Sequence, residues 1–376
     1  MSALDRQIRR ATQADGRVDV KSLDLDALRW FMRDLGKPEH RGLKVYKHIW
    51  QKGVTDFADV EGIPKTVRAE LGQRAVISVL DEATRLESAD GTTKFLWRLD
   101  DGSHVESVLI PDEDRPGPNP ARYTLCVSTQ VGCAMACTFC LTGDLGLKRN
   151  LKAAEIAAQV HQVQQYMNAE LGGRRLTNVV MMGMGEPLHN FDNVVVALRT
   201  MLSEEALNLS HRKITVSTVG LVPKLEQLAQ TLPVNIAVSL NATTEDQRRE
   251  VMPITLKYSM HELMDACRRL PLPSGKRITF EYVMLGGFND TDADAERLCE
   301  LMRDVPAKVN LIPYNENPDR DIRRPSPERV KSFQHHLVTR GIHCSVRTTR
   351  GLDVSAACGQ LGKAVERMAE RIRPDT

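Results

Sequence analysis

Three closely spaced cysteines are the residues of this chain best suited to chemistry. Cys133, Cys137 and Cys140 form a C-x3-C-x2-C pattern, and aromatic Phe139 precedes the last thiol. Iron–sulfur clusters are usually held by four cysteine thiolates, so three on one loop would leave one iron of a [4Fe–4S] cube open. The alternatives are a zinc site and loose structural thiols. Zinc would need a fourth Cys or His at finger-like spacing, and none lies nearby on the chain.

The C-x3-C-x2-C spacing is typical of enzymes that use S-adenosylmethionine (SAM) as a source of radicals. In radical SAM enzymes the open iron binds the amino and carboxylate groups of SAM. The spacing therefore predicts a radical SAM enzyme with two cofactors, a [4Fe–4S] cluster and SAM. It does not identify the substrate.

The composition places the chain among ordinary soluble enzymes. The 376 residues have a net charge of +2 and 27% are charged, which argues against a polycationic tail. No apolar run approaches the roughly 20 residues of a membrane span, and the N-terminus lacks the apolar core of a signal peptide. Eight cysteines, three of them clustered, indicate a reducing compartment. We therefore expect a cytoplasmic enzyme with no membrane partner.

The first hundred residues have the pattern of a separate module. Helical periodicity predicts three helices, around residues 23–32, 43–51 and 66–84. Lys94–Arg98 and Glu106–Ile110 alternate like a hairpin about Asp101 and Gly102, and prolines 116, 118 and 120 mark a linker. We expect an N-terminal helical domain over residues 1–96, followed by a hairpin and linker over residues 97–122.

From Tyr123 onward, strand and helix patterns alternate. Runs rich in β-branched residues predict six strands, at Leu125–Ser128, Asn178–Met182, Lys213–Thr218, Asn235–Leu240, Ile278–Met284 and Lys308–Ile312. Amphipathic stretches predict helices, for example at Ala153–Ala169, Phe191–Leu202, Met260–Leu270, Ala293–Arg303 and Glu328–Arg340. This pattern predicts an α/β fold, a parallel sheet curved into a partial (β/α)6 barrel over residues 123–349. Residues 350–376 would form a C-terminal segment. The cysteine loop follows the first strand, which places it at the ligand-binding mouth.

Several motifs together point to one family. They are the cluster loop with its flanks and a set of segments at strand ends: 126–151, 182–187, 217–220, 238–242, 281–284 and 350–361. With these motifs the chain resembles the RlmN/Cfr family of radical SAM RNA adenine methyltransferases. The similarity covers nearly the whole chain, including Gly53–Phe57 in the N-terminal module, and it is closest to the RlmN branch. It implies that the N-terminal module is a helical RNA-binding domain.

The resemblance also implies a set of SAM-binding residues, most of them at C-terminal strand ends. They are Gly185, Glu186, Ser217, Ser239, Leu240, Asn241 and Asn315. Gly183-Met-Gly-Glu-Pro187 could be mistaken for a dinucleotide-binding loop, but it lacks the third glycine and the helix-opening context. A lone serine or asparagine at such a position is otherwise a cap or turn residue.

Three further residues match the family's catalytic groups. Carbon 2 of adenine lies between two ring nitrogens and is electron-poor, so it will not attack the methyl group of SAM directly. The resemblance implies that Cys358 first accepts the methyl group. It also implies that Cys126 resolves the later RNA adduct by forming a disulfide with Cys358, and that Glu106 accepts the C2 proton. Cys267, Cys299 and Cys344 fit core positions.

The implied reaction is methylation of carbon 2 of an adenine in 23S rRNA, with tRNA as a second candidate substrate. Two alternatives stay open: methylation of carbon 8, as in the Cfr branch, and an RNA-binding protein whose cluster is structural or redox-sensing. Basic residues are in excess over acids between Lys308 and Arg350, which suits phosphate contacts. The loop from Glu316 to Pro325 departs from the family pattern and would affect substrate fit. We expect a monomer that depends on an electron donor such as flavodoxin.

Overall fold

A small helical module forms the N-terminal part of the molecule. The computed structural model describes residues 2–112, 122–273, 275–317 and 320–362. The module's helices are α1 (Ala3–Ala11), α2 (Leu25–Asp34), α3 (His40–Lys52) and α4 (Lys65–Arg74). A short parallel pair, β1 (Val18–Asp19) and β2 (Ala75–Val76), joins its start to its end. In α2, Asp24 caps the first turn by accepting a hydrogen bond from the Ala27 N–H (3.0 Å).

The predicted helix over residues 66–84 is correct only in its first half. The helix ends at Arg74, and residues Asp81–Glu87 form strand β3 instead. Antiparallel pairing with β4 (Thr93–Arg98) determines this structure, since tertiary pairing overrides local helix propensity. The expected boundary at residue 96 therefore falls inside β4. The predicted hairpin is confirmed, because β4 pairs antiparallel with β5 (His104–Asp112). The linker prolines lie outside the described residues.

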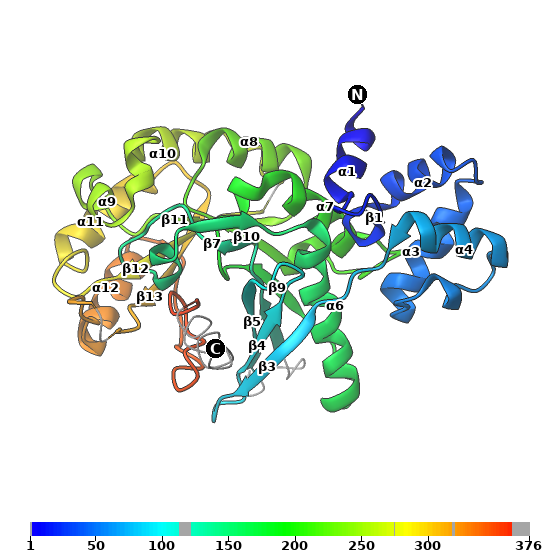
Figure 1. Ribbon diagram of the computed structural model, residues 1–376. Helices are drawn as coiled ribbons and strands as arrows, with labels where there is room; N and C mark the ends of the chain where they lie inside the picture. The colour runs from blue at the N-terminus through cyan, green and yellow to red at the C-terminus, as the bar shows by residue number, and fades with distance from the viewer. Residues whose placement is uncertain (1, 113–121, 274, 318–319, 363–376) are drawn as a thin grey trace.

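A ten-stranded sheet forms the body of the protein (Figure 1). Its order is β14-β13-β12-β11-β10-β9-β6-β5-β4-β3. The strands not yet given are β6 (Arg122–Cys126), β9 (Asn178–Met181), β10 (Ile214–Thr218), β11 (Asn235–Ser239), β12 (Ile278–Met284), β13 (Ala307–Pro313) and β14 (Cys344–Val346). All neighbours from β6 to β14 pair in parallel, which confirms the six predicted strands, with β14 in addition.

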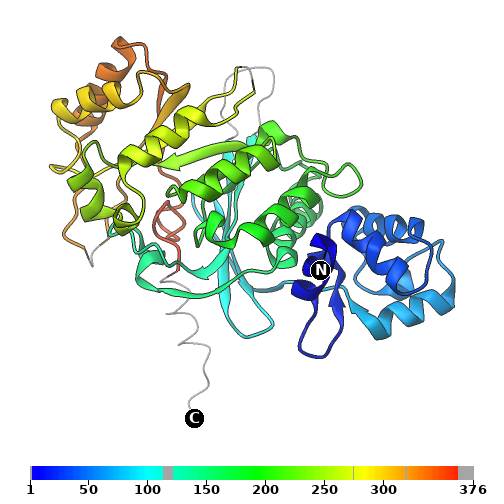
Figure 2. The same cartoon turned by 90° about the horizontal axis from the view of Figure 1, so that it is seen from above.

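Helices cover the outer face of this curved sheet, as Figures 1 and 2 show. They are α6 (Ala153–Glu170), α7 (Phe191–Leu202), α8 (Val222–Thr231), α9 (Glu245–Val251), α10 (Met260–Arg269), α11 (Asp292–Leu301) and α12 (Pro327–Thr339). The five predicted helices are confirmed to within two residues, whereas α8 and α9 were not predicted. The cluster loop also contains a short helix, α5 (Leu141–Asp144), and lies between the paired strands β7 (Gln130–Gly132) and β8 (Leu147–Asn150).

The N-terminal module packs on α6 and α7. The buried hydroxyl of Tyr46 donates a hydrogen bond to Thr200 Oγ1 (3.0 Å), and Asp24 forms an ion pair with Arg199 (2.9 Å). These contacts join the module to the outer layer of helices, away from the cluster loop (Figure 2). No described helix is both long and apolar enough to cross a membrane.

The C-terminal segment fills the open side of the curved sheet (Figure 1, red). On one side, the Gly351 N–H donates to Asp90 Oδ2 in the turn before β4 (2.9 Å). On the other, Asn315 Nδ2, just after β13, donates to the Cys358 carbonyl (3.1 Å). Segments from distant parts of the sequence therefore hold Cys358 between the two edges of the barrel.

Candidate active site

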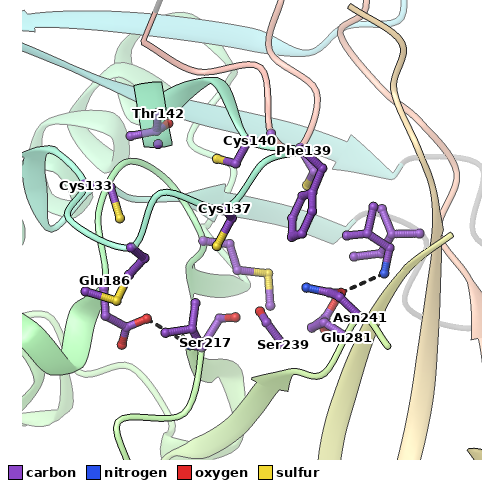
Figure 3. A pocket seen from close by; sticks show the side chains of 18 of the residues that line it. Cys133, Cys137, Phe139, Cys140, Thr142, Glu186, Ser217, Ser239, Asn241 and Glu281 are labelled. Atoms are coloured by element: carbon purple, nitrogen blue, oxygen red, sulfur yellow. Dashed lines mark hydrogen bonds between the residues drawn. The ribbon is translucent and has the colours of Figure 1, made fainter. Parts of the chain in front are cut away.

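The three cluster cysteines line one pocket at the C-terminal ends of the parallel strands (Figure 3). Two backbone hydrogen bonds hold their loop, from the Cys133 N–H to the Gly146 carbonyl (2.9 Å) and from the Thr138 N–H to the Val251 carbonyl (3.0 Å). In Figure 3 the three thiols lie on one side of the pocket, and Glu186 and Ser217 lie on the other. The loop therefore presents its sulfurs toward the strand ends.

This donor set fits an iron–sulfur cube. Each thiolate of such a site binds a different iron, so the sulfurs are farther apart than around one zinc ion. Within the described ranges, no three Cys, His, Asp or Glu side chains are placed to hold a single metal ion. Burial raises the pKa of Cys133 to about 12. Iron binding requires thiolates, so cluster formation would have to overcome this cost of deprotonation and would release the protons.

Glu186 is fixed in the wall opposite the thiols. Its carboxylate accepts hydrogen bonds from the Val219 N–H (2.9 Å) and the Leu188 N–H (2.9 Å). Burial raises its pKa to about 7, and these bonds oppose the shift. Gly185 precedes it with φ +100°, and a Cβ there would lie 2.5 Å from Gln130 Cβ, so only glycine fits. The loop thus aims one preorganised carboxylate into the pocket.

Polar groups at neighbouring strand ends complete the pocket wall. Ser217 and Ser239 lie in β10 and β11, and both line the pocket. Asn241 follows β11 in a left-handed conformation (φ 55°), and its Oδ1 accepts the Val283 N–H (2.8 Å). Asn315 lines the same pocket after β13. Parallel strands bring these side chains, distant in sequence, to one edge.

Cys358 lies where this pocket meets a second cavity. It lines both, as do Arg347 and Glu281. The second cavity, of about 480 Å³, also contains the basic side chains of Lys308 and Arg350. Cys358 can therefore be reached from the strand-end pocket on one side and from a basic chamber on the other.

Cys126 is close enough to Cys358 for their charges to interact. Burial at the end of β6 raises the pKa of Cys126 to about 12, and the neighbouring Cys358 contributes to this shift. The guanidinium of Arg347 opposes this shift. The pKa of Arg347 is itself raised, chiefly by Cys358, and also by Glu281 and Cys126. One cation thus faces both thiols.

Comparisons with known proteins agree with this arrangement. Residues 127–302 match the model of the radical SAM superfamily. Residues 18–77 match the ribosomal RNA large subunit methyltransferase N-terminal domain. The chain is 48% identical over 356 residues to the dual-specificity RNA methyltransferase RlmN 2 of Myxococcus xanthus (strain DK1622), covering 94% of this chain and 92% of that protein. The chain belongs to the RlmN family.

A further relative and a solved structure agree with this assignment. The dual-specificity RNA methyltransferase RlmN of Geobacter sulfurreducens is 49% identical, with 92% of each chain covered. A crystal structure of a radical SAM methyltransferase from Sphaerobacter thermophilus aligns with a TM-score of 0.82 at 42% identity, covering 91% of this chain and 98% of that one. Radical SAM proteins, RlmN among them, use a [4Fe–4S] cluster and SAM. The pocket holds the thiols and polar groups that such a pair requires.

Most of the predicted SAM-binding residues line this pocket. Six of the seven line the pocket, and the exception is Leu240. Its side chain is fully buried. Only its backbone faces this region, where its N–H donates to the Glu281 carbonyl (3.0 Å). Leu240 therefore supports the pocket wall through its backbone.

Glu106 is not among the residues that line either cavity beside Cys358. It lies on β5, 1% exposed, beneath the C-terminal segment. Its Oε2 accepts the Gly362 N–H (3.0 Å), and its Oε1 is 3.4 Å from Lys94 Nζ. Burial raises its pKa, and Lys94 opposes the shift. In this RlmN protein the predicted proton acceptor is thus covered by the segment that carries Cys358.

Sequence reasoning missed two arginines of this RlmN site. Arg347 was counted only as one of several phosphate-binding charges. Arg248 had no predicted role. Its side chain is fully buried. Its Nη2 donates to the Val219 carbonyl (2.7 Å), and its Nε donates to the Leu240 carbonyl (3.3 Å). It ties together the loops after β10 and β11. It lies within the charged run Glu245–Glu250, a pattern that gives no sign of a buried residue.

The loop that departs from the family pattern contacts the cluster loop. Arg320 donates to the Cys140 carbonyl (3.2 Å) and to both oxygens of Asp144 (2.7 Å each). Arg324 donates to the Tyr314 carbonyl (3.0 Å), next to Asn315. Two residues of this loop, 318 and 319, lie outside the described ranges. The loop therefore packs beside the site, where it can affect the fit of a substrate.

Proposed function

We propose that this protein methylates carbon 2 of an adenine in 23S rRNA and, as a second substrate, in tRNA. The observation that carries the proposal is the placement of Cys358. It lies between the strand-end pocket and a basic cavity, with Cys126 and Arg347 beside it. Its RlmN relatives are named dual-specificity RNA methyltransferases, and the matches cover 92% of the length of each.

Cys358 acts first, as the methyl carrier. A thiolate is a good nucleophile for the sulfonium methyl group of SAM, whereas electron-poor carbon 2 is not. The displacement forms a sulfur–carbon bond on Cys358 and releases S-adenosylhomocysteine. Arg347 lines both cavities together with Cys358, so a cation lies near the reacting sulfur.

The S-methyl group of Cys358 must next lose a hydrogen atom before it can add to the adenine. When bound, the cluster supplies the electron with which a second SAM is cleaved, so that hydrogen can be removed from the S-methyl group. Gly185, Glu186, Ser217, Ser239 and Asn241 would hold that SAM beside Cys358. The methylene radical then adds to carbon 2, which attaches the RNA covalently to Cys358 and leaves one unpaired electron on the ring. This electron would return to the bound cluster, so that loss of the C2 proton gives a closed-shell adduct.

Release of the RNA requires a base and a second thiol. Glu106 takes the proton from carbon 2. The thiolate of Cys126 then attacks the Cys358 sulfur, forms a disulfide and breaks the sulfur–methylene bond. The electron pair of that bond passes to the methylene carbon, which is protonated to give the methyl group. An external reductant such as flavodoxin supplies the electrons for turnover.

The RNA is proposed to enter through the basic cavity. Lys308, Arg347 and Arg350 line it together with Cys358, and cations placed there suit the phosphates that flank a target base. The N-terminal module, which matches a ribosomal RNA methyltransferase domain, would bind RNA farther from the site. We expect the protein to act as a cytoplasmic monomer.

The test is an anaerobic assay of the reconstituted protein with SAM, a reductant, and 23S rRNA fragments or tRNA. Mass spectrometry of the digested RNA should find 2-methyladenosine, and Cys358→Ala should make none. Detection of 8-methyladenosine would instead assign the Cfr-type reaction. RNA binding without formation of 5′-deoxyadenosine would reject the enzymatic proposal.

The same preparation tests the methyl carrier directly. Peptide mass spectrometry of protein purified with its cluster intact should find one added methylene mass on the Cys358 peptide. If Cys358→Ala still methylated RNA, the methyl-carrier role would be wrong.

A further inference from the structure

Lys94 and Glu106 form a buried ion pair beneath the segment that carries Cys358. In the antiparallel ladder, Lys94 of β4 lies opposite Val108 of β5, so Glu106 is its diagonal neighbour on the same face. The distance from Lys94 Nζ to Glu106 Oε1 is 3.4 Å, and the two side chains are 3% and 1% exposed. On the other face of β4, Phe95 packs against Tyr166 of α6. The pair therefore points into the barrel, toward the C-terminal segment.

The remaining hydrogen bonds of this pair come from the C-terminal segment. Buried ions are costly unless further hydrogen bonds satisfy them. Lys94 Nζ donates to the Ser355 carbonyl (3.3 Å), and Glu106 Oε2 accepts the Gly362 N–H (3.0 Å). Ser355 lies three residues before Cys358, and Gly362 lies four residues after it. The ion pair thus holds the Cys358 loop through hydrogen bonds on both sides of Cys358.

The contact with Gly362 also covers the carboxylate that the proposed mechanism needs. The target adenine can transfer its C2 proton to Glu106 only after the hydrogen bond between Gly362 and Glu106 has opened. When it opens, the carboxylate keeps its charge only if a cation stays beside it, because burial favours the protonated form. Lys94 is that cation, and it belongs to strand β4 rather than to the C-terminal segment.

We propose that Lys94 is a positioning residue that latches the Cys358 segment through Glu106 and keeps Glu106 ionised when the segment opens. The second part of this inference, that Lys94 keeps Glu106 ionised, rests on the proposed function. The first part, that the ion pair holds the Cys358 segment in place, concerns the protein without RNA and does not depend on that function. The proton moves from carbon 2 to the Glu106 carboxylate, and the C–H electron pair stays on the ring.

The test uses Lys94→Met, which keeps length but removes charge, and Lys94→Arg, which keeps the charge. Lys331→Met is the matched control, since Lys331 is exposed on α12. Hydrogen–deuterium exchange of peptides within residues 351–362 is measured without RNA. Lys94→Met should exchange there about tenfold faster than wild type, as the loss of a charge-assisted hydrogen bond predicts. Lys94→Arg and Lys331→Met should stay near wild type.

A second measurement follows the RNA adduct in a single turnover. Lys94→Met should still carry the methyl group on Cys358 and form the adduct, but should resolve it at least about tenfold more slowly, as the loss of a working general base predicts. Lys94→Arg should restore the rate, which a purely structural role of the side chain would not predict. Wild-type exchange or wild-type adduct resolution in Lys94→Met would overturn the proposal.

Glu106→Gln is a second variant that tests the same ion pair if Lys94→Met does not fold. The glutamine keeps an acceptor for Gly362 but loses the charge, so the segment should again exchange faster than in wild type. Unchanged exchange in Glu106→Gln would also overturn the latch. If wild-type protein makes no methyladenosine, the proposed function fails, and the exchange experiment still decides the latch.

Discussion

Replacement of Cys126 should trap the RNA on the enzyme. In the proposed sequence Cys126 acts only after the methylene carbon has joined the base. Cys126→Ala should therefore keep the cluster, SAM cleavage and methylation of Cys358. It loses the sulfur that frees Cys358, so the RNA should stay covalently attached. Cys358→Ala should form no adduct, and the double variant should behave like Cys358→Ala.

Burial of Cys126 determines how fast the RNA adduct is resolved and how this rate depends on pH. With a pKa of about 12, about one thiol in 10⁴ is a thiolate at pH 8. The pKa is raised, so the reactive form is scarce below it and increases with pH. In wild type, adduct resolution should therefore rise about tenfold per pH unit, or about 100-fold from pH 7 to pH 9. Once Cys358 carries a carbon substituent it has no charge, so its contribution to the shift disappears at that step.

The assay is a denaturing gel that follows the retarded RNA–protein band over time at several pH values, with nuclease trimming to confirm the adduct. Cys267→Ala is the matched control, because Cys267 is also a buried thiol with a pKa raised to about 12 but lies on α10. It should turn over normally. A pH-independent resolution rate, or normal turnover by Cys126→Ala without trapped RNA, would refute the reasoning.

Three further predictions test other parts of the structure. Replacing any one of the cluster cysteines, for example Cys137→Ala, should abolish iron–sulfur absorption and SAM cleavage together; a variant that kept both would contradict the cluster assignment. Arg347→Met should raise the pKa of Cys126 further, because it removes the cation that opposes the shift, and should slow adduct resolution about tenfold or more, whereas Arg347→Lys should retain part of the rate; equal rates in all three proteins would exclude this role. Tyr46→Phe should cost about 1 kcal/mol of unfolding free energy through its lost bond to Thr200, measured by urea unfolding, without changing Cys358 methylation.

Local patterns were sufficient to predict the cluster loop and the order of strands and helices. The cluster thiols lie within eight residues, so their spacing alone limits how they can converge. Parallel strands that are buried on both faces appear as apolar runs, and helices between them show their own period. These signals are short-range, which is why the observed elements of the core agree with them. Helix α8 was missed although Pro223 stands at its start.

The same local signals failed where a partner far along the chain decides the structure. Residues 75–84 carry a helical pattern, but pairing with β4 makes part of them a strand. Arg248 lies in a charged run and yet is fully buried, because carbonyls after two different strands need its donors. Neither outcome could be predicted without knowing which segments meet.

The sequence by itself determined the family, the cluster and SAM, and the identity of the three catalytic candidates, because these depend on residue types at particular positions. Only the tertiary structure decided how they act together. It placed Cys126 near Cys358 with Arg347 facing both, and it covered Glu106 with the segment from Ser355 to Gly362 over Lys94. Apart from the pair Arg347 and Cys358, these relations join residues more than 200 positions apart. They exist because folding brings the first and last strands of an open barrel together around one segment, and the burial that results changes the charge and reactivity of the groups beneath it.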